Sequence, residues 1–238
     1  MQFNSTRVYQ VVALVAGVAL VYLVIEHHII GVAALFYLAA LIPSVILHEL
    51  SHGVVALWCG DDTARASGRL SLNPLRHIDP FGSVLVPAVM ILAGLPAFGW
   101  AKPVPVNLAR LRRPRNQSVL VSLAGPVTNI LLAGLAALVL RQMLTGPTGG
   151  DLMLFIALFG EVNVVLAVFN LIPIPPLDGS AVVERLLPNS MLDGYLQLRR
   201  FALPLVLVLV LLGGTLLADI FNPALRLWES AVTYLPRI

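Results

Sequence analysis

The stretch Leu47-His48-Glu49-Leu50-Ser51-His52 decides how the rest of this chain is interpreted. Histidines four residues apart lie on one face of an α-helix, so the imidazoles of His48 and His52 can reach a single metal ion. Glu49 lies beside them as a candidate general base. In this HExxH spacing the two histidines are zinc ligands. The stretch therefore predicts a zinc centre on a helix.

The run that contains this stretch is apolar enough to lie in a bilayer. It extends from about Ile29 to Trp58 and is stopped by Gly60-Asp61-Asp62. At about 1.5 Å per residue, His52 and His48 lie roughly 9 to 15 Å from Trp58 along the helix axis. Ionisable side chains at that depth are costly and mark functional sites. We therefore expect metal chemistry inside the membrane.

The composition is that of a polytopic membrane protein. Of the 238 residues, 58% are hydrophobic and 11% are charged, and the mean hydropathy of +0.91 is far above that of a soluble domain. The net charge of +3 does not indicate nucleic-acid binding, because the basic residues fall in loops between apolar runs, where they act as topology signals. The single cysteine, Cys59, excludes a cysteine-rich metal site, so histidines and carboxylates must hold the metal.

Four further apolar runs are of about the length that a transmembrane helix needs. They are Val8–Ile25, Ser118–Leu144, Leu152–Ile172 and Phe201–Ile220. No convincing cleavage site follows the first run, so we expect a retained span rather than a signal peptide. The fold class that we predict is an all-α polytopic membrane protein with about five full transmembrane helices. Residues 1–238 are expected to form a single membrane-embedded domain without a soluble accessory domain.

The segment Ser83–Gly99 decides the topology, because it is apolar but short and is interrupted by two prolines and two glycines. If it does not cross, twelve of the fifteen basic residues share one side of the membrane; if it crosses, they divide seven against eight. A strong bias is the usual pattern, so we expect a re-entrant or half-spanning segment. The twelve basic residues are Arg7, Arg65, Arg69, Arg76, Lys102, Arg110, Arg112, Arg113, Arg115, Arg185, Arg199 and Arg200.

A third metal ligand must come from elsewhere in the chain, because a catalytic zinc usually has three protein ligands. Asp178 is the best candidate. It follows a run with three prolines in residues 173–176, which cannot continue a regular helix and so projects the carboxylate from an irregular segment. If Ser83–Gly99 does not cross, the chain crosses away and back between His52 and Asp178. Ligand geometry and charge bias therefore favour the same topology.

The segments outside the apolar runs are expected to be structured loops. Residues 60–82 are rich in turn formers and predict short β-like elements, such as a hairpin. His77 and Asp79 in this loop are either extra ligands or, as we expect, residues that fix a turn. Residues 99–117 predict an extended stretch followed by a basic one. Ser180–Leu187 is expected to form a short amphipathic helix.

Several polar residues in or beside the apolar runs need partners. Asn129 lies at membrane depth and requires a hydrogen-bond partner. Asn163 and Asn170 are seven residues apart, so they lie on one helix face and predict a polar seam. Glu161 has no assigned role. Lys102 is expected to be interfacial rather than a substrate contact.

Five motifs stand in order between Ile42 and Gly179: HELSH, LNPLRHIDPFGS, GWAKPVPVN, AGPVTN and FNLIPIPPLDG. Together they resemble the site-2 protease family of intramembrane zinc metalloproteases, of the M50 type. The resemblance implies that one Zn²⁺ per chain is bound and that Glu49 is the catalytic acid and base. The metal ligands that it implies are His48, His52 and Asp178.

The resemblance also implies residues around the metal. It places Asn170 and Pro175 near the substrate cleft, and it matches Asn129 to a polar position that such proteins carry on the span before the aspartate. These three residues are expected to contact the substrate or to support the metal ligands.

The function that we expect is hydrolysis of peptide bonds within or near transmembrane segments of membrane proteins, as in regulated intramembrane proteolysis. The partners are a transmembrane protein substrate and the lipid bilayer, with no nucleic acid. The charge bias favours a multi-pass protein of the cell membrane with its active site nearer the cytoplasmic side. Two alternatives are a metal-ion transporter and a catalytically inactive membrane binding protein. A transporter would show ligands along a path over several spans, and an inactive relative would lack Glu49 or a ligand.

Overall fold

The computed structural model describes residues 32–92, 99–144 and 149–234. The expected first span, Val8–Ile25, lies outside the described residues. The regular elements within the described residues are all helical, which confirms the expected helical class.

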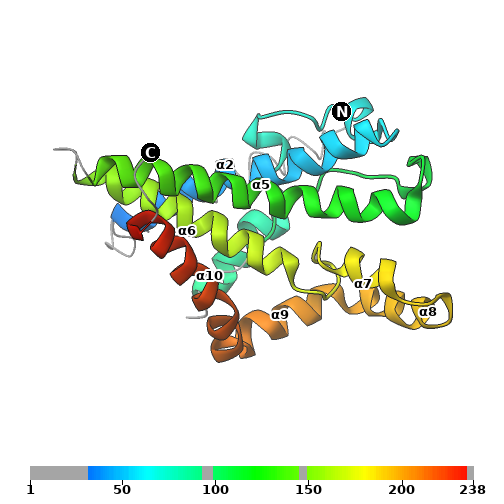
Figure 1. The fold of residues 1–238 in the computed structure, drawn as a ribbon. Coiled ribbons are helices and arrows are strands. Elements are labelled where there is room, and N and C mark those ends of the chain that lie inside the picture. Colours follow the sequence, from blue (N-terminus) through cyan, green and yellow to red (C-terminus); the bar gives the residue numbers. More distant parts are fainter. Residues whose placement is uncertain (1–31, 93–98, 145–148, 235–238) are drawn as a thin grey trace, which may run out of the picture.

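Three long helices form the body of the molecule (Figure 1). They are α2 (Val32–Trp58), α5 (Pro114–Met143) and α6 (Asp151–Leu171). At about 1.5 Å per residue, each is long enough for a hydrocarbon layer of about 30 Å, and each is apolar enough to cross a membrane. The expected spans in these three regions are therefore confirmed. The described residues provide three such helices, or four with one bent pair, so the count of about five remains a prediction.

Small residues and one buried tryptophan join these helices to α10 (Gly214–Tyr234). Ala133, Ala136 and Ala137 of α5 are buried in one cluster with Trp228 of α10. A Cβ atom at Gly160 of α6 would overlap the Trp228 ring, and the Trp228 indole donates a hydrogen bond of 2.8 Å to the carbonyl of Ala133. Helices in lipid associate through such close packing and hydrogen bonds rather than through the hydrophobic effect.

The described part of the segment Ser83–Gly99 is too short to cross a bilayer. Its described helical part begins inside η2 (Pro80–Leu85) and continues through α4 (Val86–Leu92), and the two elements together make about 20 Å of helix at 1.5 Å per residue. The two ends of the segment lie together. The backbone N–H of Trp100 donates to the carbonyl of Gly82 (3.0 Å), and the Ser83 hydroxyl donates to the carbonyl of Trp100 (2.8 Å). A re-entrant segment requires this return to its starting point.

The loops contain helical turns where we expected short β-like elements, and no strand occurs in the described residues. The turns are α3 (Thr63–Ala66), η1 (Pro74–Arg76) and η3 (Leu108–Arg110). Asn73, Asp79 and Asn107 explain the difference, because each accepts hydrogen bonds from N–H groups two or three residues later and so starts a helical turn.

The C-terminal region confirms one expectation and corrects another. The expected short helix is α7 (Ser180–Leu186). The expected span Phe201–Ile220 is not one continuous helix, because α9 (Ala202–Leu212) ends at Gly213 and α10 starts at Gly214. In the preceding polar region, α8 (Asn189–Gln197) and η4 (Leu198–Phe201) replace the expected loop. Glycine ends the helix here, and a Cβ atom at Gly213 would collide with the carbonyl of Leu209.

Candidate metal centre

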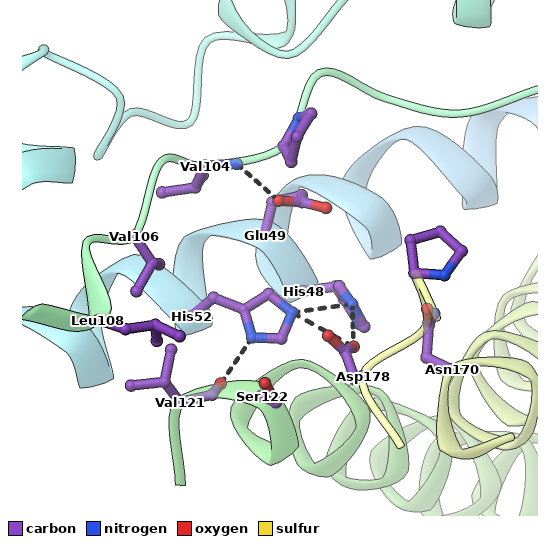
Figure 2. Close-up of a pocket in the computed structure, with 12 residues that line it drawn as sticks. His48, Glu49, His52, Val104, Val106, Leu108, Val121, Ser122, Asn170 and Asp178 are labelled. Carbon is purple, nitrogen blue, oxygen red and sulfur yellow. Dashed lines mark hydrogen bonds and ion pairs between the residues drawn. The ribbon is translucent and has the colours of Figure 1, made fainter. Parts of the chain in front are cut away.

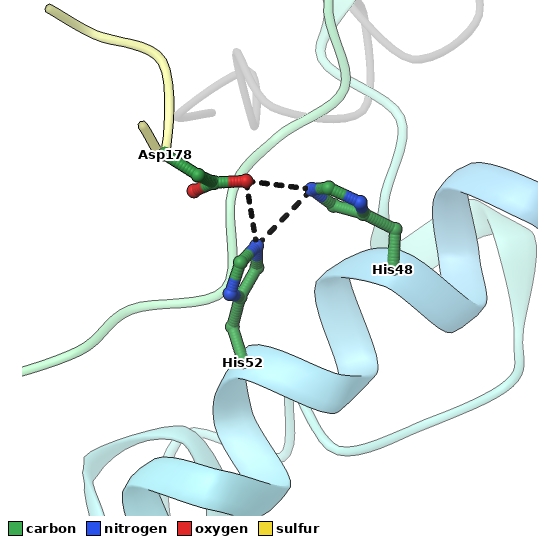
Figure 3. A group of neighbouring side chains, drawn as sticks. All are labelled: His48, His52 and Asp178. Carbon is green, nitrogen blue, oxygen red and sulfur yellow. Dashed lines mark hydrogen bonds and ion pairs between the residues drawn. The ribbon is translucent and has the colours of Figure 1, made fainter. Parts of the chain in front are cut away.

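Three candidate ligand atoms meet where α2 faces the loop after α6 (Figure 3). The Nε2 atoms of His48 and His52 are 3.1 Å apart. One carboxylate oxygen of Asp178, Oδ2, lies 3.2 Å from His48 Nε2 and 3.4 Å from His52 Nε2. Both histidines are buried. Two ligands on successive turns of one helix thus receive the third from a segment more than a hundred residues later.

The loop that carries Asp178 is turned back onto α6. The prolines end α6 at Leu171, and the N–H of Gly179 then donates to the carbonyl of Asn170 (2.7 Å). A Cβ atom at Gly179 would collide with the carbonyl of Leu171, so only glycine allows this return. The return holds the neighbouring Asp178 against α2.

The Nδ1 atom of each histidine ring is hydrogen-bonded to α5. His52 Nδ1 lies 2.7 Å from the carbonyl oxygen of Val121, and His48 Nδ1 lies 2.5 Å from Oδ1 of Asn129. A carbonyl oxygen only accepts, so His52 Nδ1 carries the proton and, in the neutral ring, His52 Nε2 presents a lone pair. Metal-binding histidines are held in this way.

The donor set fits zinc. Ligand atoms about 2.0–2.1 Å from a tetrahedral zinc are about 3.3–3.4 Å apart, close to the three separations seen here. Asp178 Oδ2 is buried without a hydrogen-bond partner in the described residues, which an anionic oxygen tolerates when it faces a cation. Two imidazoles with one carboxylate favour zinc over calcium or magnesium, which prefer oxygen ligands.

Gly125 of α5 leaves the space that such an ion needs. A Cβ atom at this position would lie 2.5 Å from the Nε2 atoms of both His48 and His52. A side chain at this position would therefore crowd the two nitrogens that would face the metal. Glycine is therefore required where α5 passes the metal centre.

A cavity of about 250 Å³ opens beside the three ligand residues (Figure 2). Glu49 lines it, and its Oε2 atom accepts a hydrogen bond of 2.8 Å from the backbone N–H of Val104. Val104 belongs to the segment 99–107, which is neither helix nor strand. This segment and α5 line the cavity on either side of α2.

The segment 99–107 is held a second time, beyond Val104, by the turn that follows α2. The backbone N–H of Asn107 donates to Oδ2 of Asp61 (2.6 Å), and the hydroxyl and N–H of Thr63 donate to Oδ1. Burial raises the pKa of Asp61, but the bonds from Thr63 and Asn107 outweigh it, so the pKa of this carboxyl lies below its ordinary value. Asp61 is thus a charged anchor for the end of the segment.

The remaining predicted site residues take different positions. Asn170 lines the cavity, and its amide donates to the carbonyl of Leu166 (3.0 Å). Asn129 lies behind His48 rather than in the cavity lining. Pro175 is fully buried and does not line the cavity, whereas its neighbour Pro176 does. The role of Pro175 near the substrate cleft stays a prediction.

The polar residues of the loops do not join the metal centre. Asp79 accepts hydrogen bonds from the N–H groups of Phe81 and Gly82. His77 is buried, with Nε2 2.7 Å from the carbonyl of Ser71. Both residues fix turns, as expected. Lys102 is exposed, and Glu161 lies in α6, outside the cavity lining.

Three features of the site were not identified from the sequence. Gly125 appears in the sequence only as part of the AGPVTN motif, without an assigned role, and its closeness to the two histidines becomes visible in the structure. The carbonyl of Val121 and the N–H of Val104 are backbone groups. Their roles depend on which segments meet, so no pattern in the residue types could have indicated them.

Known proteins resemble this chain over most of its length. The profile of peptidase family M50 matches residues 36–147. The provisionally named zinc metalloprotease YwhC of Bacillus subtilis (strain 168) is 41% identical over 196 residues, which cover 79% of this chain and 86% of YwhC. The provisionally named zinc metalloprotease Rip2 of Mycolicibacterium smegmatis is 31% identical over 198 residues, with 83% and 71% covered. Rip2 of Mycobacterium tuberculosis (strain H37Rv) is 32% identical with the same coverage. No solved structure matches.

The apolar helices, the metal-binding cluster and these relatives define a membrane metalloprotease. The expected resemblance is thereby confirmed. The chain belongs to peptidase family M50, the site-2 protease family of zinc metalloproteases.

Proposed function

We propose that this chain is an intramembrane zinc endopeptidase that hydrolyses peptide bonds within or near transmembrane segments, the reaction of regulated intramembrane proteolysis. The observation that carries the proposal is the common cavity of Glu49, His48, His52 and Asp178 on a helix that is apolar enough to cross a membrane. An acid–base residue and a metal site beside one cavity are the parts that peptide hydrolysis requires.

His48, His52 and Asp178 would hold one Zn²⁺, and zinc at this site supplies a Lewis acid that polarises a carbonyl and makes water more acidic. Glu49 takes the proton from the attacking water and passes it to the leaving amine. The Val104 N–H holds one oxygen of the Glu49 carboxylate, which leaves the other for proton transfer. Asn170, with one amide hydrogen bonded to Leu166, has a second available for the substrate.

The chemistry of the reaction favours an unwound substrate. The carbonyls of a transmembrane helix are held in backbone hydrogen bonds within the helix, so a substrate would enter as an extended strand with its carbonyls freed for attack. Val104, Val106 and Leu108 alternate along one wall of the cavity, so the segment 99–107 is the edge against which that strand would pair.

The distribution of charge supports an active site near the cytoplasmic face of the cell membrane. Within the described residues, all basic side chains except Arg141 and Arg226 lie either in residues 65–115, from the turn after α2 to the first turn of α5, or in residues 185–200, from α7 to η4. Contacts join these segments: Arg185 of α7 donates to Asn116 of α5 (2.7 Å), and Arg199 of η4 pairs with Glu184 of α7 (2.6 Å). Cytoplasmic loops carry such an excess of basic residues.

The direct test is cleavage of a transmembrane peptide by the purified chain in liposomes. We expect the wild-type protein with zinc to cut the peptide at a site inside or next to its apolar stretch, as located by mass spectrometry. Glu49→Gln should bind zinc but cut the peptide about 10²–10⁴-fold more slowly. Undiminished cleavage by Glu49→Gln would reject the proposed role of Glu49, and zinc flux into the liposomes that is independent of Glu49 would favour a transporter.

A further inference from the structure

Three polar side chains are completely buried where the three long helices meet. Ser44 of α2, Asn129 of α5 and Asn163 of α6 each have no exposed surface. A buried amide in a membrane-embedded helix requires hydrogen-bond partners. These three residues supply partners for one another, and the chain of hydrogen bonds ends at His48.

The hydrogen bonds run in one sequence through all three helices. His48 Nδ1 lies 2.5 Å from Asn129 Oδ1. The Nδ2 atom of Asn129 donates to Oδ1 of Asn163 (2.7 Å). The Nδ2 atom of Asn163 donates both to the backbone carbonyl of Phe159 (2.8 Å) and to the hydroxyl of Ser44 (2.8 Å).

The Phe159 carbonyl, at the far end of this series of hydrogen bonds, determines which group donates and which accepts in each of them. The Phe159 carbonyl can only accept, so the atom of Asn163 that faces it must be the amide nitrogen. Oδ1 of Asn163 then faces Asn129 and requires the nitrogen of Asn129, which leaves Oδ1 of Asn129 for His48. An oxygen acceptor at that position requires a proton on His48 Nδ1 and, in the neutral ring, leaves a lone pair on His48 Nε2.

We propose that Asn163 is a positioning residue that fixes the proton of His48 on Nδ1, two hydrogen bonds away, and thereby keeps Nε2 ready to bind the metal. This inference rests on the proposed metal role of His48. Asn163 does not line the cavity, and its side chain is hydrogen-bonded to Asn129, Ser44 and Phe159 rather than to a metal ligand. Without it, the amide of Asn129 can rotate, present its nitrogen to His48 and move the proton to Nε2, where zinc must displace it.

The test is ¹⁵N NMR of the metal-free protein labelled at histidine nitrogens, at a pH where the rings are neutral. The signals of His48 are assigned by their loss in His48→Ala. In the wild type we expect only the Nδ1–H form of His48. In Asn163→Leu, which has nearly the same shape but no polar atoms, we expect both forms. If half of the rings carry the proton on Nε2, the dissociation constant for zinc, measured by chelator competition, rises about twofold.

Two matched variants separate positioning from packing. Asn163→Asp is neutral when buried and can donate its hydroxyl to Phe159 while its carbonyl accepts from Asn129, so it should restore the single Nδ1–H form. Ser44→Ala removes a member of the same cluster but leaves the Phe159 carbonyl to orient Asn163, so it should also keep the single form. These results would support the inference.

A single Nδ1–H form in folded Asn163→Leu would overturn the inference, as would an Nε2–H form in the wild type. A mixture in Ser44→Ala would also overturn it, because packing rather than the Phe159 carbonyl would then set the proton. A zinc affinity that is unchanged in His48→Ala would instead contradict the proposed metal role of His48, and the NMR result on the wild type would still decide where the proton of His48 lies.

Discussion

Helix α5 and the segment 99–107 both contact α2 at the metal centre, but they contact different residues through different groups. Helix α5 contacts the two histidines, through the side chain of Asn129 and the carbonyl of Val121. The segment 99–107 contacts Glu49, through the N–H of Val104. The metal ligands and the acid–base residue thus have separate supports. We therefore expect substitutions on α5 to change zinc binding, and substitutions in the segment to change the rate while zinc stays bound.

Gly125→Ala should have the largest effect. The added methyl group would lie 2.5 Å from both histidine Nε2 atoms, in the space where the ion binds, although no ligand is removed. We expect zinc content close to zero by elemental analysis and no detectable cleavage. Gly134→Ala is the matched control on the same helix, because a Cβ atom there meets nothing within 4 Å. Full zinc content in Gly125→Ala would show that the ion does not bind between these nitrogens.

Glu49→Gln should reduce the rate without affecting the metal. A general acid and base contributes about 10²–10⁴-fold, and the amide of glutamine cannot take a proton from water. We expect a decrease of kcat in that range, measured with a transmembrane peptide, and one zinc per chain. A loss of zinc in this variant would mean that Glu49 also holds the metal. The metal ligands and the acid–base residue would then not have separate roles.

Val104→Pro tests the segment itself, since proline has no N–H to donate to Glu49. Misplacement of a catalytic group by about 1 Å can cost 10²-fold, so we expect kcat to fall by about 10–100-fold with zinc retained. Val104→Ala keeps the N–H and should change kcat much less, although the smaller side chain in the cavity can alter KM. Equal decreases of kcat in the two variants would attribute the effect to the side chain.

Asp61→Asn should have the smallest effect on the rate. Its main effect should be a lower free energy of unfolding. Asparagine would place an N–H₂ group against backbone donors, at a cost of about 1–3 kcal/mol. Because the pKa of Asp61 is lowered in the folded protein, its contribution is present above the unfolded pKa of about 3.9 and is lost as the pH falls through the folded pKa.

The measurement for Asp61 is the thermal unfolding of the metal-free wild type and Asp61→Asn in detergent, from neutral to acidic pH. The difference in midpoint should be largest near neutral pH and should shrink below about pH 4. A difference that is independent of pH would mean that the carboxylate charge does not anchor the segment.

The parts of the molecule that the sequence predicts well depend on local patterns. Residues 32–58, 114–143 and 151–171 are helices because long apolar runs can satisfy their backbone in lipid only in this way. The HExxH spacing places His48 and His52 together in any helix, and the prolines before Asp178 force an irregular loop. These features need no knowledge of which segments meet.

The features that the sequence could not predict depend on tertiary contacts or on competition between local signals. Hydropathy alone treats residues 201–220 as one span, whereas in the structure α9 ends at Gly213 and α10 begins as a separate helix. Asn163 lies on a predicted polar seam, but its partners are on other helices. The space that Gly125 leaves for an ion exists only because α5 crosses α2 at that turn.

The most direct test of the account is the ligand shell of zinc in the purified protein, measured by X-ray absorption together with zinc stoichiometry. We predict one zinc per chain, with two imidazole nitrogens and oxygen donors at about 2.0–2.2 Å. The signal of one imidazole should disappear in His48→Ala, and the shell should lose an oxygen in Asp178→Ala or the protein should lose its zinc. An unchanged shell in both variants, or a wild-type protein that binds no zinc, would contradict the assignment of His48, His52 and Asp178 as the metal centre.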